Sequence, residues 1–283
     1  MNSDKLNAII KKKSSGNNNL AHHLHQMFFF EHVLMRLEKS KYRDNIILKG
    51  GVLLSSIIGE DLRTTKDIDA TLKSLPLSID SIKSIFNEIL SIDINDNVNF
   101  EIENVKDIRL DSVYGGFRIN VKGTFDKIRT NFCIEITTGD IITQREIKYK
   151  YNSIFENKTI NIMAYTIETI IAEKFESIIS KNITTTRAKD FYDLYMLINK
   201  HKSNINNKNL VKAIENTFNK RNTEFNIDSF KEIVEMLNDS NSLKKVFTDY
   251  QSKLEYTKEV SFGDTIKAIN KIINILEAEL VGV

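Results

Sequence analysis

The sequence predicts an α+β fold, in which a β-sheet with flanking helices is followed by a C-terminal helical domain. Three segments that alternate apolar and polar residues, 99–108, 115–125 and 130–140, indicate a half-buried antiparallel sheet. Residues 20–40 and 79–91 carry apolar side chains at helical spacing, which predicts helices that pack on that sheet. The last third of the chain shows helical spacing only.

A chain of 283 residues with 41% hydrophobic content can bury a substantial core, and its length suggests about two domains. We expect a core domain over residues 1–160 and a helical domain over 161–283. The patches at 11–19, 93–99 and 201–209 are rich in Asn and Lys and are expected to be loops.

Cysteine content and apolar run length limit the class of protein, whereas net charge does not. The formal charge of +2 neither requires nor excludes nucleic acid as a partner. The single cysteine, Cys133, excludes an internal disulfide framework and fits a reducing compartment. Apolar runs are far shorter than the roughly 20 residues of a membrane helix, and the N-terminus has no signal-peptide core. We therefore expect a soluble, cytoplasmic protein.

The predicted helix at 20–40 has one apolar stripe, so its phenylalanine run is assigned to the core. Four of the five histidines lie in this helix. Because no cysteine or carboxylate framework accompanies them, we interpret them as part of a packed or solvated helix face and not as a metal site. They are His22, His23, His25 and His32.

The segment 49–72 is predicted to bind phosphate. A short strand at 46–48 leads into Gly50 and Gly51, which permit a sharp turn and close approach of the backbone to a ligand. A short helix follows, and the unpaired amides at its N-terminus form a site for an anion such as a triphosphate. The candidate nucleotide-binding residues here are Lys49, Gly50, Gly51 and Arg63.

Asp67 and Asp69 are the candidate metal ligands. They alternate with Ile68 and Ala70, so a strand here buries one face and directs both carboxylates from the other. Hard cations such as Mg²⁺ commonly bind one or two carboxylates together with substrate phosphates. An Asp-x-Asp pair alone is common in polar turns, and the glycine turn and helix beside it make the metal interpretation stronger.

Glu135 is a candidate third carboxylate. It alternates with Ile134 and Ile136 in a later predicted strand and therefore faces away from the core. A neighbouring strand could bring it beside Asp67 and Asp69 and complete a two-metal site for phosphoryl transfer. The competing interpretation is an ordinary exposed strand glutamate.

In the helical part, Lys174 lies on the apolar stripe of its helix. A lysine on a core-facing line should reach an anion, either a carboxylate or a bound phosphate, unless it extends along the helix surface to solvent. The next helix opens with threonines that can cap it, and carries Arg187, Asp190 and Asp193 in its early turns. Arg187 and Asp190 share one helix face.

Several segments, in order, resemble the AbiEii/AbiGii family of nucleotidyltransferase toxins from bacterial abortive-infection and type IV toxin–antitoxin systems, to which the MenT toxins are related. The similar segments are RLEKSKYRDNIILKGGVLL, LRTTKDIDATL, VYGGFRINV, CIEITTGDIIT, YTIETIIAEKFESII and TTTRAKDFYDLYML. They lie within residues 27–200. Similarity of ordered segments is more specific than any single short motif.

The resemblance implies a nucleotidyltransferase fold related to polymerase β, with a mixed sheet that carries Asp67 and Asp69 as metal carboxylates. It implies that the helical domain supplies Lys174 for the triphosphate, with Arg187 beside it, and Asp190 or Asp193 for catalysis. The expected substrate is an NTP, the expected cofactor is Mg²⁺ or Mn²⁺, and the expected acceptor is an RNA hydroxyl such as the tRNA 3′ end. The expected biological role is phage defence. The expected partner is a cognate antitoxin that acts without forming a stable complex with the toxin.

Two other functions stay open at this point. The same metal and triphosphate residues would serve nucleotidylation of a protein hydroxyl. A nucleotide-binding module without catalysis, acting by sequestering GTP or a partner, is the third interpretation, although the intact Asp-x-Asp unit argues against it.

Overall fold

The structure is a computed structural model that describes residues 1–59, 63–76, 78–108 and 115–281. The chain divides into two compact units, which are described separately below. Unit 1 consists of Met1–Asp140 and Glu146–Ala164, and unit 2 consists of Ile141–Arg145 and Tyr165–Val283. The division predicted after residue 160 falls inside a strand of unit 1.

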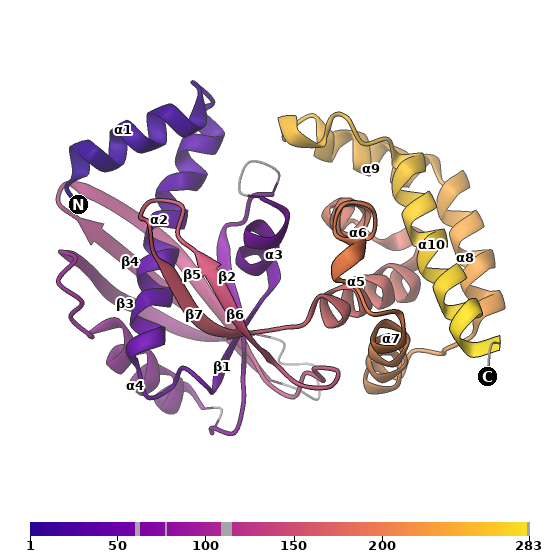
Figure 1. Ribbon diagram of the computed structural model, residues 1–283, viewed down its shortest axis with the longest axis horizontal. Coiled ribbons are helices and arrows are strands. Elements are labelled where there is room, and N and C mark those ends of the chain that lie inside the picture. The colour runs from indigo at the N-terminus through magenta and orange to yellow at the C-terminus, as the bar shows by residue number, and fades with distance from the viewer. Residues whose placement is uncertain (60–62, 77, 109–114, 282–283) are drawn as a thin grey trace. The chain divides into compact units, whose positions relative to one another are not determined.

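Unit 1 contains a seven-stranded sheet in the order β3-β4-β5-β2-β1-β7-β6 (Figure 1). β2 runs parallel to β5 and β1 runs parallel to β7, whereas the other neighbours are antiparallel, so the sheet is mixed. The strands are β1 (Ile46–Lys49), β2 (Asp67–Leu72), β3 (Val98–Ile108), β4 (Gly116–Phe125), β5 (Ile128–Thr137), β6 (Ile147–Asn152) and β7 (Thr159–Ala164).

Two helices of unit 1 pack on the apolar face of this sheet. The rings of Phe30 and Phe132 meet with their centroids 5.2 Å apart, and Phe86 shares a buried apolar cluster with Ile68 and Ile134. This packing joins α2 and α4 to β2 and β5. The helices of unit 1 are α1 (Ser3–Ser14), α2 (Asn18–Lys39), α3 (Gly50–Ile58) and α4 (Ile79–Leu90).

The predicted α+β class, the two packing helices and the strands predicted at 67–72, 99–108, 115–125 and 130–140 are confirmed, except that the last strand ends at Thr137. Helix α1 was not predicted, and its last residues fall in the patch 11–19 that was expected to be a loop. Leu6 and Ile10 are the buried apolar positions of this mostly polar helix. Strands β6 and β7, which have six residues each, were not predicted either. Strands of that length carry too few positions for a clear period.

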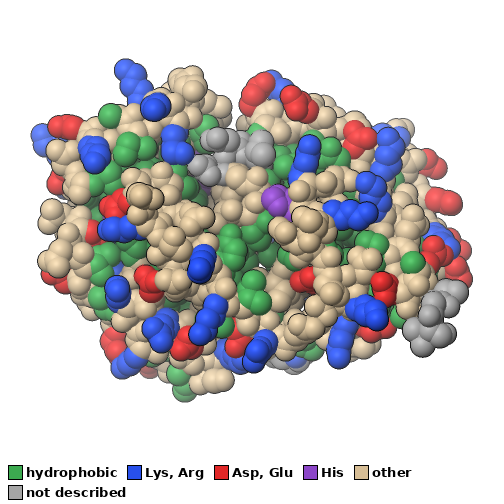
Figure 2. All heavy atoms as spheres, in the orientation of Figure 1, with side chains coloured by type: hydrophobic (Ala, Val, Ile, Leu, Met, Phe, Trp, Pro, Cys, Tyr) green, Lys and Arg blue, Asp and Glu red, His purple; other side chains and the backbone are tan. Residues whose placement is uncertain are grey.

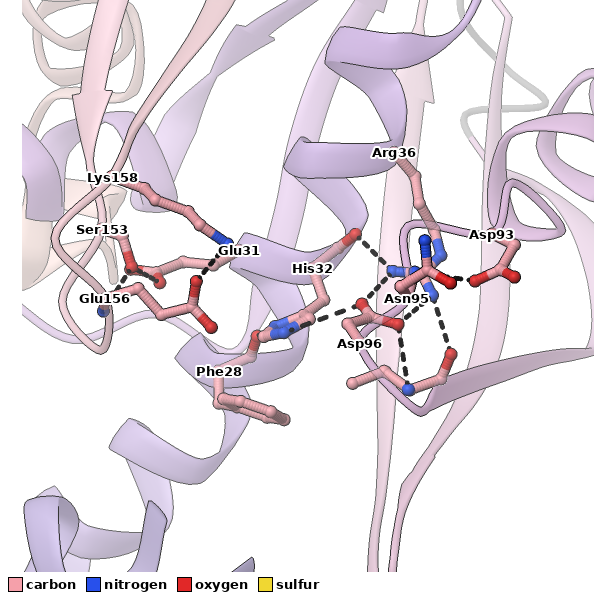
Figure 3. A network of polar contacts seen from close by, with 11 residues as sticks. Phe28, Glu31, His32, Arg36, Asp93, Asn95, Asp96, Ser153, Glu156 and Lys158 are labelled. Carbon is pink, nitrogen blue, oxygen red and sulfur yellow. Dashed lines mark hydrogen bonds and ion pairs between the residues drawn. The ribbon is translucent and has the colours of Figure 1, made fainter. Parts of the chain in front are cut away.

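Buried polar contacts fix α2 against the rest of unit 1 (Figure 3). Arg36 donates to both oxygens of Asp96, at 2.7 and 2.9 Å, and to the carbonyl of Val98 at 2.7 Å. His32 is buried beside this pair, with its Nε2 3.7 Å from Asp96, and burial lowers its pKa. His32 is therefore part of a packed helix face.

Glu31 holds the β6–β7 hairpin from the same helix (Figure 3). Its carboxyl group accepts from the Ser153 hydroxyl at 2.5 Å, from the Ile154 amide at 2.7 Å and from the Tyr151 hydroxyl at 3.3 Å. Burial raises the pKa of Glu31 to about 7, because desolvation of the charged form outweighs these hydrogen bonds.

Unit 2 is helical, as predicted. Phe175, Phe218 and Phe230 form an aromatic core between α5, α7 and α8, with ring centroids 5.1 to 5.9 Å apart. The helices are α5 (Ile167–Lys181), α6 (Ala188–Lys200), α7 (Asn207–Arg221), α8 (Ile227–Asp239), α9 (Asn241–Gln251) and α10 (Phe262–Val281), with short 3-10 turns at Asn182–Thr184, Lys202–Asn204 and Glu255–Thr257.

The predicted threonine cap of α6 is wrong. Arg187 occupies the N-cap position without a side-chain cap bond, and Thr185 accepts instead from the Arg187 amide at 3.2 Å.

Among the described helices, none combines the length and apolar character needed to cross a membrane. On the face drawn in Figure 2, Lys and Arg side chains are interspersed with Asp and Glu, in keeping with the formal charge of +2.

Candidate active site

Asp67 and Asp69 lie on the polar face of β2, as the alternation predicts. Both are half-buried, while Ile68 and Ala70 between and beside them are buried in the core. Successive side chains of a strand point to opposite faces, so the two carboxylates share one face. This arrangement places two hard oxygen donors side by side.

The glycine turn lies against Asp69. Gly50 has a φ of +62°, and a Cβ at this position would overlap the Asp69 carboxylate. The amide of Gly51, at the start of α3, donates to Oδ2 of Asp69 over 3.1 Å. The backbone of the glycine turn therefore lies close to an anion of the protein itself, the side chain of Asp69, and its approach to a bound triphosphate stays a prediction.

Residues 63–66 precede β2 and lie near the glycine turn. Arg63 is buried, and its guanidinium donates to the carbonyl of Thr64. The hydroxyl of Thr65 donates to the Asp67 carbonyl at 3.2 Å, and a Cβ at Gly51 would overlap that hydroxyl. Thr65 is therefore packed against the glycine turn and bonded to the start of the carboxylate strand. Nucleotide binding by Arg63 stays a prediction.

The sheet register brings Glu135 beside the aspartates. Glu135 on β5 is the direct partner of Asp69 on β2, and Cys133 is the partner of Asp67. The Glu135 carboxylate accepts from Arg118 on β4, through Nε at 3.0 Å and Nη2 at 2.5 Å. Glu135 in turn raises the pKa of Arg118. The predicted position of Glu135 is correct, and its role as a metal ligand stays a prediction.

Lys49 belongs to a second polar cluster at the end of the same strands. Its ammonium forms an ion pair with Asp140 and donates to the Thr137 hydroxyl at 2.7 Å. Asp140 also accepts from Thr71 at 2.6 Å and from Thr137 at 2.8 Å. The Lys49 ammonium and these hydroxyls hold the pKa of Asp140 well below its usual range, against the opposing effect of burial.

Sequence reasoning missed Asp140 and Arg118. Asp140 is the last residue of the strand segment predicted at 130–140, and Arg118 alternates with buried Phe117 and Ile119, so both carried a weak signal. Arg118 is paired with Glu135, and Asp140 is brought to Lys49, by the arrangement of the strands in the sheet. No local sequence pattern shows that arrangement.

In unit 2, the structure brings Lys174, Asp190, Asp193 and Arg187 together. The ammonium of Lys174 lies 2.6 Å from Asp190 and 2.7 Å from Asp193. Nε of Arg187 lies 2.8 Å from the second oxygen of Asp190, as the shared helix face predicts. Both aspartates are buried. The partners of Lys174 are therefore carboxylates, one of the two kinds of anion predicted for it. Binding of a triphosphate by Lys174 stays a prediction.

The carboxylate pair fits a hard divalent cation. Among the described residues, no group of three or more His, Cys, Asp or Glu side chains is placed to hold a metal ion. Mg²⁺ usually takes only one or two protein carboxylates and completes its shell with waters and substrate phosphates. Asp67 and Asp69 supply such a pair, and their oxygen-only chemistry suits Mg²⁺ or Mn²⁺.

The sequence of this chain was compared with protein families and with curated proteins. The chain matches, over residues 32–268, the family described as "Nucleotidyl transferase AbiEii toxin, Type IV TA system". Among curated proteins, none is significantly similar in sequence to this chain.

Two solved structures from Helicobacter pylori are similar to it. A candidate nucleotidyltransferase has a TM-score of 0.52 at 14% identity, with 92% of this chain and 96% of that chain covered, and therefore shares the fold. The protein JHP933 has a TM-score of 0.49 at 15% identity, with 92% and 95% covered.

The family match extends over most of unit 1 and unit 2, including β1, the glycine turn, the Asp67–Asp69 strand and the Lys174 cluster. A match of that extent establishes family membership, which none of the individual motifs does alone. The chain therefore belongs to the AbiEii family of nucleotidyltransferase toxins of type IV toxin–antitoxin systems.

Proposed function

We propose that this toxin transfers a nucleoside monophosphate from an NTP to an RNA hydroxyl, with a divalent cation held by Asp67 and Asp69. The observation that carries the proposal is the contact between the glycine turn and the carboxylate strand. Gly51 donates its amide to Asp69, so the turn proposed to bind phosphate and the carboxylates proposed to bind metal are in direct contact.

Each residue of this unit has a defined task. Asp67 and Asp69 would hold Mg²⁺ or Mn²⁺, and the cation would supply positive charge that neutralises the phosphates. Gly50 and Gly51 let the triphosphate approach the backbone. Arg63 is a proposed phosphate ligand in the adjoining loop. The acceptor hydroxyl attacks the α-phosphorus, the bond to the bridging oxygen breaks, and pyrophosphate leaves with that oxygen.

Catalysis of this kind depends on positioning and charge neutralisation. The protein contributes fixed carboxylates and does not form a covalent bond to the substrate in this scheme. Lys174, with Arg187, is proposed to bind the β- and γ-phosphates, and Asp190 or Asp193 to act in catalysis. These proposals for unit 2 rest on the family resemblance and are tested by substitution.

The acceptor proposed is the 3′ end of tRNA, by resemblance to family members that modify tRNA. Nucleotide addition there would stop translation until an antitoxin counteracts the toxin. Type IV systems include an antitoxin, and we propose that the cognate one acts without a stable complex.

A labelling experiment identifies both the nucleotide and the acceptor. The purified protein is incubated with each α-labelled NTP, Mg²⁺ and a cell extract, and the product is then treated with ribonuclease or protease. We expect the label to be lost to ribonuclease and to resist protease. Loss to protease would instead indicate nucleotidylation of a protein. NTP binding without any labelled product or pyrophosphate would indicate a non-catalytic module.

A further inference from the structure

The charged residues of the polar sheet face are arranged so that a lysine lies beside the proposed metal carboxylates. Lys49 on β1 is the direct cross-strand partner of Asp69 on β2. Cross-strand partners lie about 4.5 to 5.5 Å apart at Cβ, and a lysine side chain can easily span that distance. An ammonium at Asp69 would compete with a cation for the same carboxylate.

The structure directs the Lys49 ammonium elsewhere. Lys49 is buried, and its ammonium bonds to Asp140 and to the hydroxyl of Thr137, which lies two strands away on β5. Between Lys49 and Asp69 themselves there is no ion pair within 4.0 Å. Asp69 instead accepts from the Gly51 amide at 3.1 Å.

Asp140 is built to hold this ammonium. Its Oδ2 atom accepts from Lys49, from Thr71 at 2.6 Å and from Thr137 at 2.8 Å. Thr71 and Thr137 are themselves direct partners across β2 and β5, and both are buried. The Asp140 side chain is half-buried, and a carboxylate with several donors on one oxygen is rigidly placed; removing its charge leaves the buried lysine without compensation.

We infer that Asp140 is a positioning residue for the metal site: it retains the Lys49 ammonium so that the carboxylate of Asp69 stays available to a divalent cation. The inference rests on the proposed function, because it assumes that Asp67 and Asp69 bind the cation. It also assigns Lys49 to the organisation of the site and not to direct contact with nucleotide.

The test compares Mn²⁺ affinity, measured by electron paramagnetic resonance, in four proteins: the wild type, Asp140→Asn, Lys49→Met and Lys49→Met/Asp140→Asn. Asp140→Asn is expected to weaken Mn²⁺ binding by about tenfold, since the released ammonium moves to Asp69. The double variant has no lysine to release, so its affinity is expected to return to within about twofold of Lys49→Met. Equal affinity of Asp140→Asn and wild type, or a double variant as weak as Asp140→Asn, overturns the inference.

A metal-free readout separates this inference from the proposed function. In a crystal structure of metal-free Asp140→Asn, the Lys49 ammonium is expected within hydrogen-bond distance of Asp69. An ammonium that stays on Thr137 overturns the inference, whether or not the protein binds Mn²⁺. Absence of saturable Mn²⁺ binding in the wild type counts against the proposed metal site alone. If Asp140→Asn does not fold, Asp140→Ser provides the same loss of charge with a hydroxyl for Thr71 and Thr137.

Discussion

Asp69 and Glu135 are direct neighbours on the parallel strands β2 and β5, yet their carboxylates have different partners. Asp69 accepts from the backbone amide of Gly51 at 3.1 Å, whereas Glu135 accepts from the guanidinium of Arg118 at 2.5 and 3.0 Å. An amide leaves the charge of Asp69 in place, and a guanidinium neutralises that of Glu135. The two carboxylates should therefore differ in their importance for catalysis.

Glu135→Gln is expected to lower the rate of nucleotide transfer by about tenfold, because the Glu135 carboxylate is already paired with the Arg118 guanidinium. Asp69→Asn is expected to lower it by about a thousandfold, the scale seen when a preorganised electrostatic contact is removed. The measurement is the initial rate at saturating Mg²⁺ with thermal unfolding as a control for folding. Equal losses in the two variants would place Glu135 on the metal.

Gly50→Ala is expected to lower transfer by about a hundredfold, since its Cβ would displace the Asp69 carboxylate and small misplacements of reacting groups have that effect. Gly16→Ala is the matched control. Gly16 also has a positive φ, of +86°, but no atom lies within 4 Å of its Cβ position. It should lose about 1 kcal/mol of stability from backbone strain and keep its activity. Similar activity in both variants would contradict the close contact.

Lys174→Met is expected to destabilise the protein by about 3 to 5 kcal/mol, because it leaves two buried carboxylates without their shared ammonium. Asp193→Asn should cost less, since Lys174 and Arg187 then still compensate Asp190. Urea unfolding measures both. Lys181→Met, an exposed lysine in the same helix, should change stability by less than about 0.5 kcal/mol. A Lys174→Met variant as stable as this control would show that the cluster is not structural.

Glu31 should make stability depend on pH. Its pKa is about 7 in the folded protein and near the model value of 4.5 when unfolded, so between these values the folded state keeps a proton that the unfolded state releases. The free energy of unfolding should fall as pH rises through this range, by up to about 3 kcal/mol, and level off above pH 7.

Burial lowers the pKa of His32 from its ordinary value of 6.5, so below that pH His32 opposes this trend. The difference between wild type and Glu31→Gln isolates Glu31, because His32 is present in both. Urea unfolding between pH 5 and pH 8 should show a smaller decline for the variant, and Glu103→Gln, at an exposed glutamate, should follow the wild type. Parallel curves for wild type and Glu31→Gln would contradict the raised pKa.

Local patterns in the sequence correctly predicted which side chains share one face of a strand or of a helix. The alternation around Asp67 and Asp69 placed both side chains on the polar face of β2, and the helical stripe of Lys174 predicted an anionic partner, either a carboxylate or a bound phosphate. Strand register and order depend on contacts between distant segments, so no local pattern pointed to the Arg118–Glu135 pair or to Asp140 beside Lys49. The predicted threonine cap of α6 was wrong, because the hydroxyl of Thr185 accepts from the Arg187 amide before the helix begins.

The central claim is that Asp67 and Asp69 form the metal centre of a nucleotidyltransferase. It is tested most directly by the rate at which label from an α-labelled NTP is transferred to purified tRNA, with Mg²⁺ and with EDTA, for the wild type and Asp69→Asn. The account predicts transfer by the wild type that EDTA abolishes and that falls by about a thousandfold in Asp69→Asn while the variant stays folded. Transfer by folded Asp69→Asn at the wild-type rate would contradict it.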